Sequence, residues 1–272
     1  MLENWIMEKK KKIDEAILSI LPKGEGSFHQ ALKYSLFPGG KRLRPLLCLA
    51  SCASCGEITD EAYKIASAIE LIHSYSLVHD DIIDQDEMRR EKPSVYKEYG
   101  ENLAILVGDA LLTLAFGTLI DSPDVAKEII LASSEMIGGQ VDEMAISTPT
   151  KELLYQISLK KTASLFSASC VAGGIIGEGN RKQVEALRMA GERFGLAFQI
   201  ADDLTDKDTG GINILSVIGI EEAKEEIKSL IDSANTHLII FGDKAEVLKL
   251  LFFAPLMKSS LYPSSVLRKI EN

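Results

Sequence analysis

A chain of 272 residues, of which 46% are hydrophobic, can bury a sizeable core in one large domain or two small ones. Its formal net charge of -10 argues against nucleic acid or an anionic membrane as the main partner, so an anionic ligand needs local basic residues or metal ions. The sequence suggests no membrane span, and its N-terminus places the charges after the apolar part, unlike a secretory signal. We therefore expect a cytoplasmic protein.

Apolar residues recur at three- and four-residue spacing between the eight prolines, a pattern that predicts helices and almost no strand. The loops between them are short, and none is long enough to separate two domains. The sequence therefore predicts an all-α, single-domain bundle of about ten helices. Helices are expected at residues 3–20, 27–36, 45–55, 60–84, 101–120, 124–144, 150–173, 180–206, 219–240 and 243–256.

Two patterns in the first and third of these segments have simple structural explanations. The lysine run from Lys9 to Lys12 is most simply a solvated face of the first helix, with a functional basic tail as the alternative. Cys48, Cys52 and Cys55 recur at helical spacing on an apolar segment without clustered histidine, which favours a buried helix face over a zinc site.

A first acidic cluster closes the predicted helix at 60–84. Asp80 and Asp84 are four residues apart, and Asp81 and Asp84 are three apart, so the carboxylates project to one side of the helix end. Like charges at this spacing destabilise a helix unless cations neutralise them. For one such cluster alone, a solvated helix end would be the better explanation.

A second acidic cluster lies in "FGLAFQIADDLTDKD", where Gln199, Asp202, Asp203 and Asp206 again share one helix face. Two DDxxD clusters in one helical chain favour metal binding, because carboxylate oxygens suit magnesium. Magnesium usually takes one or two protein carboxylates, waters and phosphate oxygens. Two facing clusters that hold metal ions and a diphosphate between them would compensate the acidic charge.

Such a site also needs basic residues that contact the anion directly. Each basic set in this sequence would by itself be explained as surface charge, but three sets around two acidic clusters predict a site for a polyanion and magnesium. The sets are Lys41, Arg42 and Arg44 in "GGKRLRP", Arg89 and Arg90 after the first cluster, and Lys160, Lys161 and Thr162 on a predicted helix.

From about Gly39 to Asp206 the chain resembles the trans-prenyl diphosphate synthases of the polyprenyl synthetase family. The motifs that carry this resemblance, in the family's order, are "GGKRLRP", "IHSYSLVHDDIID", "RR" at 89–90, "LVGDALLTLAF", "GGQVDE", "KKTASLF" and "GLAFQIADDLTD". The resemblance implies the isoprenoid synthase fold around a central cavity and one polyprenyl synthetase domain over residues 1–272. It also implies a homodimer, for which the apolar helices around 101–144 are candidates.

The activity implied by this resemblance is the condensation of isopentenyl diphosphate with dimethylallyl, geranyl or farnesyl diphosphate to give farnesyl or geranylgeranyl diphosphate. Up to three Mg²⁺ ions would assist ionisation of the allylic substrate. The implied metal ligands are Asp80, Asp84 and Asp202, with Asp81, Asp203 and Asp206 completing the two clusters. Lys41, Arg44, His73 and Arg90 would bind isopentenyl diphosphate, and Arg89, Lys161, Thr162 and Gln199 the allylic group. The catalytic set is then Asp80, Asp81, Asp84, Lys161 and Asp202.

Product length is expected to depend on Tyr75. It precedes Asp80 by five residues, about 7.5 Å along a helix, and would form the floor of the product tunnel. Its alternative explanation is an ordinary core aromatic. Within the family, an aromatic residue here with the small Ser76 beside it suggests a short product.

The sequence departs from the family after the second acidic cluster. The family usually has a longer loop there, with lysines that bind the allylic diphosphate, whereas "DKDTGGINILSVIG" contains only Lys207, and the C-terminal part is short. A noncatalytic or weakly active partner subunit of a heteromeric synthase is therefore an alternative. A class I terpene cyclase ranks third, because it would not need the isopentenyl site of Lys41, Arg44 and His73.

Overall fold

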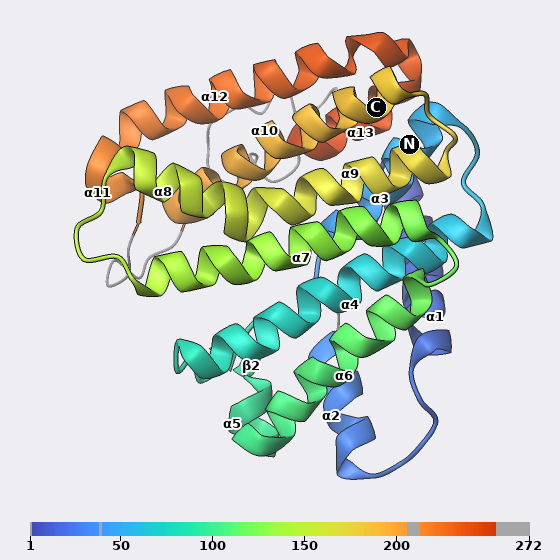
Figure 1. Ribbon diagram of the computed structural model, residues 1–272, viewed down its shortest axis with the longest axis vertical. Helices are drawn as coiled ribbons and strands as arrows, with labels where there is room; N and C mark the ends of the chain where they lie inside the picture. The colour runs from blue at the N-terminus through green and yellow to red at the C-terminus, as the bar shows by residue number, and fades with distance from the viewer. Residues whose placement is uncertain (1, 38–39, 206–212, 254–272) are drawn as a thin grey trace.

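The computed structural model describes residues 2–37, 40–205 and 213–253, and helices make up most of it, which confirms the predicted all-α class (Figure 1). The first half contains α1 (Leu2–Ile20), α2 (Ser27–Leu36), α3 (Leu43–Cys55), α4 (Asp60–Ile83), β1 (Met88–Arg89), β2 (Lys92–Pro93), α5 (Val95–Tyr99) and α6 (Glu101–Leu119). The second half contains α7 (Pro123–Met144), α8 (Lys151–Ser158), η1 (Leu159–Ala163), α9 (Ser164–Ile176), α10 (Arg181–Thr205), α11 (Leu215–Ile218), α12 (Ile220–His237), η2 (Leu238–Ala245) and α13 (Glu246–Phe253).

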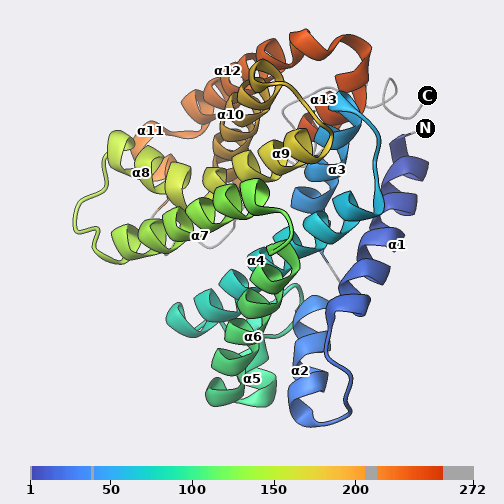
Figure 2. The same cartoon turned by 45° about the vertical axis from the view of Figure 1, so that its right-hand side comes forward.

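The long helices pack side by side around one hydrophobic core (Figures 1 and 2). Helix α9 lies against α3, α7 and α10, and α10 also packs along α12, while α4 packs along α6. A Cβ at Gly173 of α9 would lie 2.0 Å from the Cys48 carbonyl oxygen, so the close contact between α9 and α3 depends on this glycine. Cys48 and Cys52 are buried, as expected for a helix face in the core.

Helix α4 carries several residues of the candidate site. Thr59 caps its N-terminus by accepting a hydrogen bond from the Ala62 amide at 3.4 Å, and no glycine or proline interrupts it before its end. Ile65, Ile69 and Ile72 are fully buried, so the helix passes through the core. Because α4 is held by these buried residues, its C-terminal turn, which carries the first acidic cluster, has a fixed position.

Helix α6 is long and apolar enough to span a membrane by length and composition alone, which the sequence analysis did not expect. Its residues Val107, Leu111 and Ala115 are fully buried in the protein core, because this helix packs along α4. A core helix passes the same test. The opposite face, with Ile105 and Leu106, is exposed.

The structure corrects some predicted boundaries. The helix expected at 150–173 contains a π-helical turn, η1, between α8 and α9, and the helix expected from 243 begins at Glu246 after the 3-10 segment η2. The short elements α5, α11 and the β1–β2 hairpin were not predicted. The hairpin turn uses Arg90 and Glu91 at φ 54° and 64°, without the glycine or asparagine that usually signals such a turn. The expected shortened loop after Asp206 and the short C-terminal part lie outside the described residues.

Candidate active site

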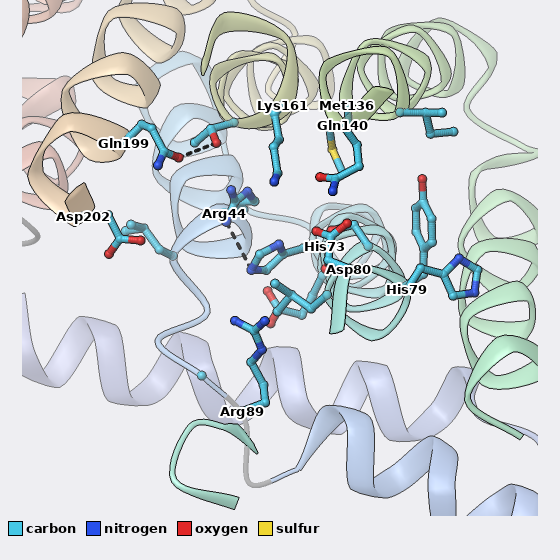
Figure 3. A pocket seen from close by; sticks show the side chains of 18 of the residues that line it. Arg44, His73, His79, Asp80, Arg89, Met136, Gln140, Lys161, Gln199 and Asp202 are labelled. Carbon is cyan, nitrogen blue, oxygen red and sulfur yellow. Dashed lines mark hydrogen bonds between the residues drawn. The ribbon is translucent and has the colours of Figure 1, made fainter. Parts of the chain in front are cut away.

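A cavity of about 1110 Å³ brings together residues from both halves of the sequence (Figure 3). Twelve of the predicted site residues line it, and they come from the loop before α3, the first turn of α3, α4, the hairpin, η1 and α10. These residues are Lys41, Arg44, His73, Tyr75, Ser76, Asp80, Arg89, Arg90, Lys161, Thr162, Gln199 and Asp202. The motifs that were far apart in the sequence thus form one site.

The loop before α3 is held in place by Arg42. This residue has a left-handed backbone conformation, and its buried guanidinium donates hydrogen bonds to Asp14 Oδ1 at 2.9 Å, Glu70 Oε1 at 2.7 Å and the Leu36 carbonyl oxygen at 2.9 Å. Arg42 therefore does not act as a free cation. It joins α1, α2 and α4 to the loop that carries Lys41.

Arg44 and His73 form the adjoining wall of the cavity. Arg44 Nη1 lies 3.3 Å from His73 Nε2, and the guanidinium carbon of Arg44 lies 4.0 Å from the centre of the Phe166 ring (Figure 3). The buried Arg44 Nε has no hydrogen-bond partner among the described atoms. An anion in the cavity would satisfy this donor, because a buried polar group without a partner is costly.

Burial and positive charge set the protonation of this wall. Burial lowers the pKa of Arg44 to about 10, which leaves it cationic at neutral pH. Burial and the neighbouring Arg44 hold the pKa of His73 well below 6.5, so its imidazole is neutral and accepts the hydrogen bond from Arg44. A neutral ring beside several cations suits the binding of an anion.

The aspartates of the first cluster have different environments. Asp80 lines the cavity, and burial together with the negative charge of Asp84 raises its pKa to about 6, although Lys161 opposes the shift. Asp81 is only 2% exposed and accepts hydrogen bonds from Arg89, one of them at 2.7 Å from Nε. Asp84 is exposed at the end of α4 and does not line the cavity. Asp81 thus orients the Arg89 side chain from outside the cavity, whereas Asp80 itself lines the cavity.

In the second cluster, too, one aspartate lines the cavity and its neighbour forms hydrogen bonds within the protein. Asp202 lines the cavity, whereas Asp203 accepts hydrogen bonds from Gln199 Nε2 at 2.9 Å and from the Ile214 amide at 3.0 Å. Gln199 Oε1 in turn accepts from the Thr162 hydroxyl at 2.7 Å (Figure 3). Asp203 therefore positions the amide of Gln199, and the predicted ligand Asp206 lies outside the described residues.

The π-helical turn η1 presents Lys161 and Thr162 to the cavity. A Cβ at Gly139 of α7 would lie 2.6 Å from the Lys161 amide nitrogen, so this glycine allows η1 to approach α7. Single π-turns often occur at functional sites, because they reorient side chains within a helix. Lys161 donates a hydrogen bond to the Glu143 carboxylate.

Sequence reasoning assigned no role to Gln140 and Glu143, both in the motif "GGQVDE" of α7. Gln140 is buried and lines the cavity, and the charge of Glu143 raises the pKa of Asp80 and Asp84. A glutamine within an acidic motif was the signal in the sequence that could have pointed to a role in the site. Because this motif is far from the two acidic clusters in the sequence, the sequence does not show that it lies near them in the fold.

The apolar end of the cavity contains Tyr75. This residue is 5% exposed, and its ring makes an edge contact with His79, with 5.8 Å between ring centres. Leu112 of α6 and Met136 of α7 line the same cavity. Tyr75 is therefore both a core aromatic and part of the cavity wall, and its role as the floor of a product tunnel stays a prediction.

The carboxylates in the cavity fit magnesium. Among the described residues no three His, Cys, Asp or Glu side chains form a ready metal site. Magnesium does not require one, because it typically takes one or two protein carboxylates and completes its octahedron with water and phosphate oxygens. Asp80 of α4 and Asp202 of α10 supply hard oxygen ligands from two different helices.

Comparison with known proteins agrees with this geometry. The polyprenyl synthetase family model matches residues 25–210. Geranylgeranyl pyrophosphate synthase 4 of Arabidopsis thaliana is 36% identical over 88% of this chain and 72% of its own length. Heterodimeric geranylgeranyl pyrophosphate synthase large subunit 2 of Arabidopsis thaliana is 34% identical over the same shares.

The described fold also has a solved counterpart. The crystal structure of geranylgeranyl pyrophosphate synthetase from Pyrococcus horikoshii superposes with a TM-score of 0.87 and 32% identity, over 93% of this chain and 97% of that chain. The helical bundle is therefore the isoprenoid synthase fold, as predicted. With the family model matching more than half of the chain, the protein belongs to the polyprenyl synthetase family.

Proposed function

We propose that this protein is a magnesium-dependent prenyltransferase that joins isopentenyl diphosphate to an allylic diphosphate and releases farnesyl or geranylgeranyl diphosphate. The observation that carries the proposal is that a cationic wall, two carboxylates and an apolar end share one cavity. Family membership and the synthases among its relatives support the same reaction class.

The cationic wall would bind the diphosphate of isopentenyl diphosphate. Lys41, Arg44 and Arg90 line the cavity there, and the orphaned Arg44 Nε supplies a donor for a phosphate oxygen. The Phe166 ring and neutral His73 fix the orientation of the Arg44 guanidinium. The diphosphate is then held while the double bond remains free to react.

The allylic diphosphate would lie between the two acidic helices. Arg89, Lys161 and Gln199 are placed to contact it, and Asp80 and Asp202, with Asp84 nearby, would hold magnesium. When bound, magnesium stabilises the negative charge of the departing diphosphate. The positive charges of Arg89 and Lys161 act in the same direction, because they lie where that charge develops.

Breaking the allylic carbon–oxygen bond gives a carbocation and free diphosphate. The double bond of isopentenyl diphosphate attacks the cation, a new carbon–carbon bond forms, and a proton passes to the released diphosphate. Water must be excluded during this step, and the apolar lining that includes Phe198, Leu77 and Met136 provides that exclusion.

Tyr75 would limit the length of the growing chain. The product tail extends from the acidic helices into the apolar end of the cavity, where the Tyr75 ring lies beside His79. Ser76, the small neighbour of Tyr75, also lines the cavity. A bulky side chain at this position would stop elongation at farnesyl or geranylgeranyl length.

We also propose that the protein forms a homodimer through α6 and α7. Large apolar side chains are exposed along these two helices, although exposed positions normally favour polar residues. They are Ile105 and Leu106 of α6, Ile120 directly after it, and Ile130 and Leu131 of α7. A second copy of the chain would cover this surface with the same surface of its own.

The alternative is a partner subunit of a heteromeric synthase. The similarity to a heterodimeric large subunit of Arabidopsis thaliana favours it in part. Asp80 and Asp202 line the cavity together with Lys41, Arg44, Arg89, Arg90 and Lys161, and this set supports catalysis by this chain itself. Product analysis with the purified chain alone separates the two, since a noncatalytic subunit forms no product without its partner.

A further inference from the structure

The cavity has one lining residue from the N-terminal helix. Lys10 of α1 lines it together with Gly40, Lys41 and Arg42 of the loop before α3. From the sequence alone, Lys10 is expected to belong to a solvated run of lysines. In the structure it lines the cavity, unlike Lys9, Lys11 and Lys12.

The neighbouring lysines have other surroundings. Lys9 and Lys12 form ion pairs with Glu8 at 3.0 Å and 3.3 Å. Lys11 lies 3.9 Å from Glu15, with its side chain 79% exposed. Among the described residues Lys10 forms no such ion pair, and it is half-buried.

Helix α1 is fixed in a way that directs this lysine to the loop. Ile13 and Ile17 are fully buried in the core, so the helix cannot rotate freely. Asp14, one turn after Lys10 on the same face, accepts the hydrogen bond from Arg42 at 2.9 Å. The face of α1 that carries Lys10 is therefore attached directly to the loop that carries Lys41.

We propose that Lys10 is a further binding residue for the diphosphate of isopentenyl diphosphate, a role that rests on the proposed function. The diphosphate is multiply charged and the protein is acidic overall, so each cation in the cavity contributes to its attraction. Lys10 acts as a point charge with three donors, alongside the planar guanidinium of Arg44. Asp14, on the same face of α1, is hydrogen-bonded to Arg42 in the loop that carries Lys41, which assigns Lys10 to this substrate rather than to the allylic one.

The test is binding of isopentenyl diphosphate to the full chain without an allylic substrate, measured by calorimetry. Lys10→Gln should weaken binding about tenfold, because one charge-assisted contact is lost. Lys11→Gln is the matched control, and its binding should equal that of the unmodified protein. Lys10→Arg should restore most of the affinity because it keeps the charge. In turnover assays Lys10→Gln should raise KM for isopentenyl diphosphate and leave KM for the allylic substrate unchanged.

Equal affinity of the unmodified protein and Lys10→Gln would overturn the role of Lys10 and leave the proposed function intact. An equal rise of both KM values would also contradict it. Unchanged thermal unfolding of Lys10→Gln, followed by circular dichroism, would support a direct role. If the unmodified protein neither bound isopentenyl diphosphate nor formed product, the proposed function itself would fail.

Discussion

Arg42 Nη1 donates a hydrogen bond to Glu70 Oε1 across 2.7 Å, and the two side chains are only 1% and 2% exposed. Glu70 precedes His73 by one helical turn on α4. The pair therefore fixes the Lys41 loop relative to His73 before any substrate binds. Preorganisation of this kind reduces the entropy lost when an anion binds.

Removal of the Glu70 charge should destabilise the fold strongly. Glu70→Gln leaves the buried Arg42 without its closest counter-charge, and we expect a loss of about 3–5 kcal/mol in the free energy of unfolding. Urea denaturation measures this change. The exposed Glu15→Gln on α1 should change it by less than about 0.5 kcal/mol. Equal stability of both variants would show that Arg42 does not depend on Glu70.

His73 should make the folded protein sensitive to acid. Because its pKa lies well below 6.5 in the fold, the unfolded chain binds more protons below that value. This contribution to stability is complete above pH 6.5 and decreases as the pH falls. His73→Gln should therefore lose less stability than the unmodified protein between pH 7.5 and pH 5.5, with a difference on the order of 1 kcal/mol. Parallel stability curves for the two proteins would contradict the buried neutral imidazole.

Asp80→Asn should separate stability from activity. Burial raises the pKa of Asp80 to about 6, so its ionised form is costly above that pH in metal-free protein. With chelator at pH 8 the variant should be more stable by on the order of 1–2 kcal/mol, and the gain should shrink toward pH 4.

The same substitution should reduce turnover roughly a hundredfold or more, since several kcal/mol of charge stabilisation depend on the ligands of the ion. Asp121→Asn, an exposed aspartate after α6, is the control and should affect neither quantity. Full activity of Asp80→Asn would exclude a metal-binding role for Asp80.

Tyr75→Ala should lengthen the product by one or more isoprene units, because it opens the apolar end of the cavity. Chromatography of the dephosphorylated products measures the chain length. Tyr63→Ala offers a matched control on the same helix, since Tyr63 is buried but does not line the cavity. Both variants should lose stability, and only Tyr75→Ala should change the product. An unchanged product would leave Tyr75 as a core residue alone.

Charged residues on the apolar surface of α6 and α7 should break the proposed dimer. Leu106 and Leu131 are 56% and 54% exposed, and a glutamate at either position would be buried unpaired in the dimer. Light scattering should then give the mass of one chain for Leu106→Glu and Leu131→Glu. Leu18→Glu, at a 50% exposed leucine on α1, should remain dimeric. Dimers in all three variants would place the interface elsewhere.

The spacing of apolar residues was sufficient to predict the long helices, because each buries one stripe in the shared core. It could not predict the π-turn at Lys161 or the hairpin turn at Arg90, since both depend on tertiary contacts rather than local signals. Gly139 illustrates this, because its missing side chain matters only where η1 approaches α7.

The acidic motifs predicted which helices face the cavity but not which carboxylate of each motif reaches it. Asp80 and Asp202 line the cavity, whereas Asp81 and Asp203 form hydrogen bonds inside the protein. Residue type and spacing cannot distinguish an aspartate that lines the cavity from one that forms hydrogen bonds inside the protein. Lys10 was predicted to be surface charge for a related reason, because the sequence does not show that it lines the same cavity as residues 40–42.

The most direct test of the account is product analysis with the purified chain, isopentenyl diphosphate and magnesium. Dimethylallyl, geranyl and farnesyl diphosphate are supplied in turn as the allylic substrate. The account predicts farnesyl or geranylgeranyl diphosphate as the final product, and no product when magnesium is removed by a chelator. Absence of product with every allylic substrate, from a folded protein that still binds magnesium, would contradict it and favour the noncatalytic partner subunit.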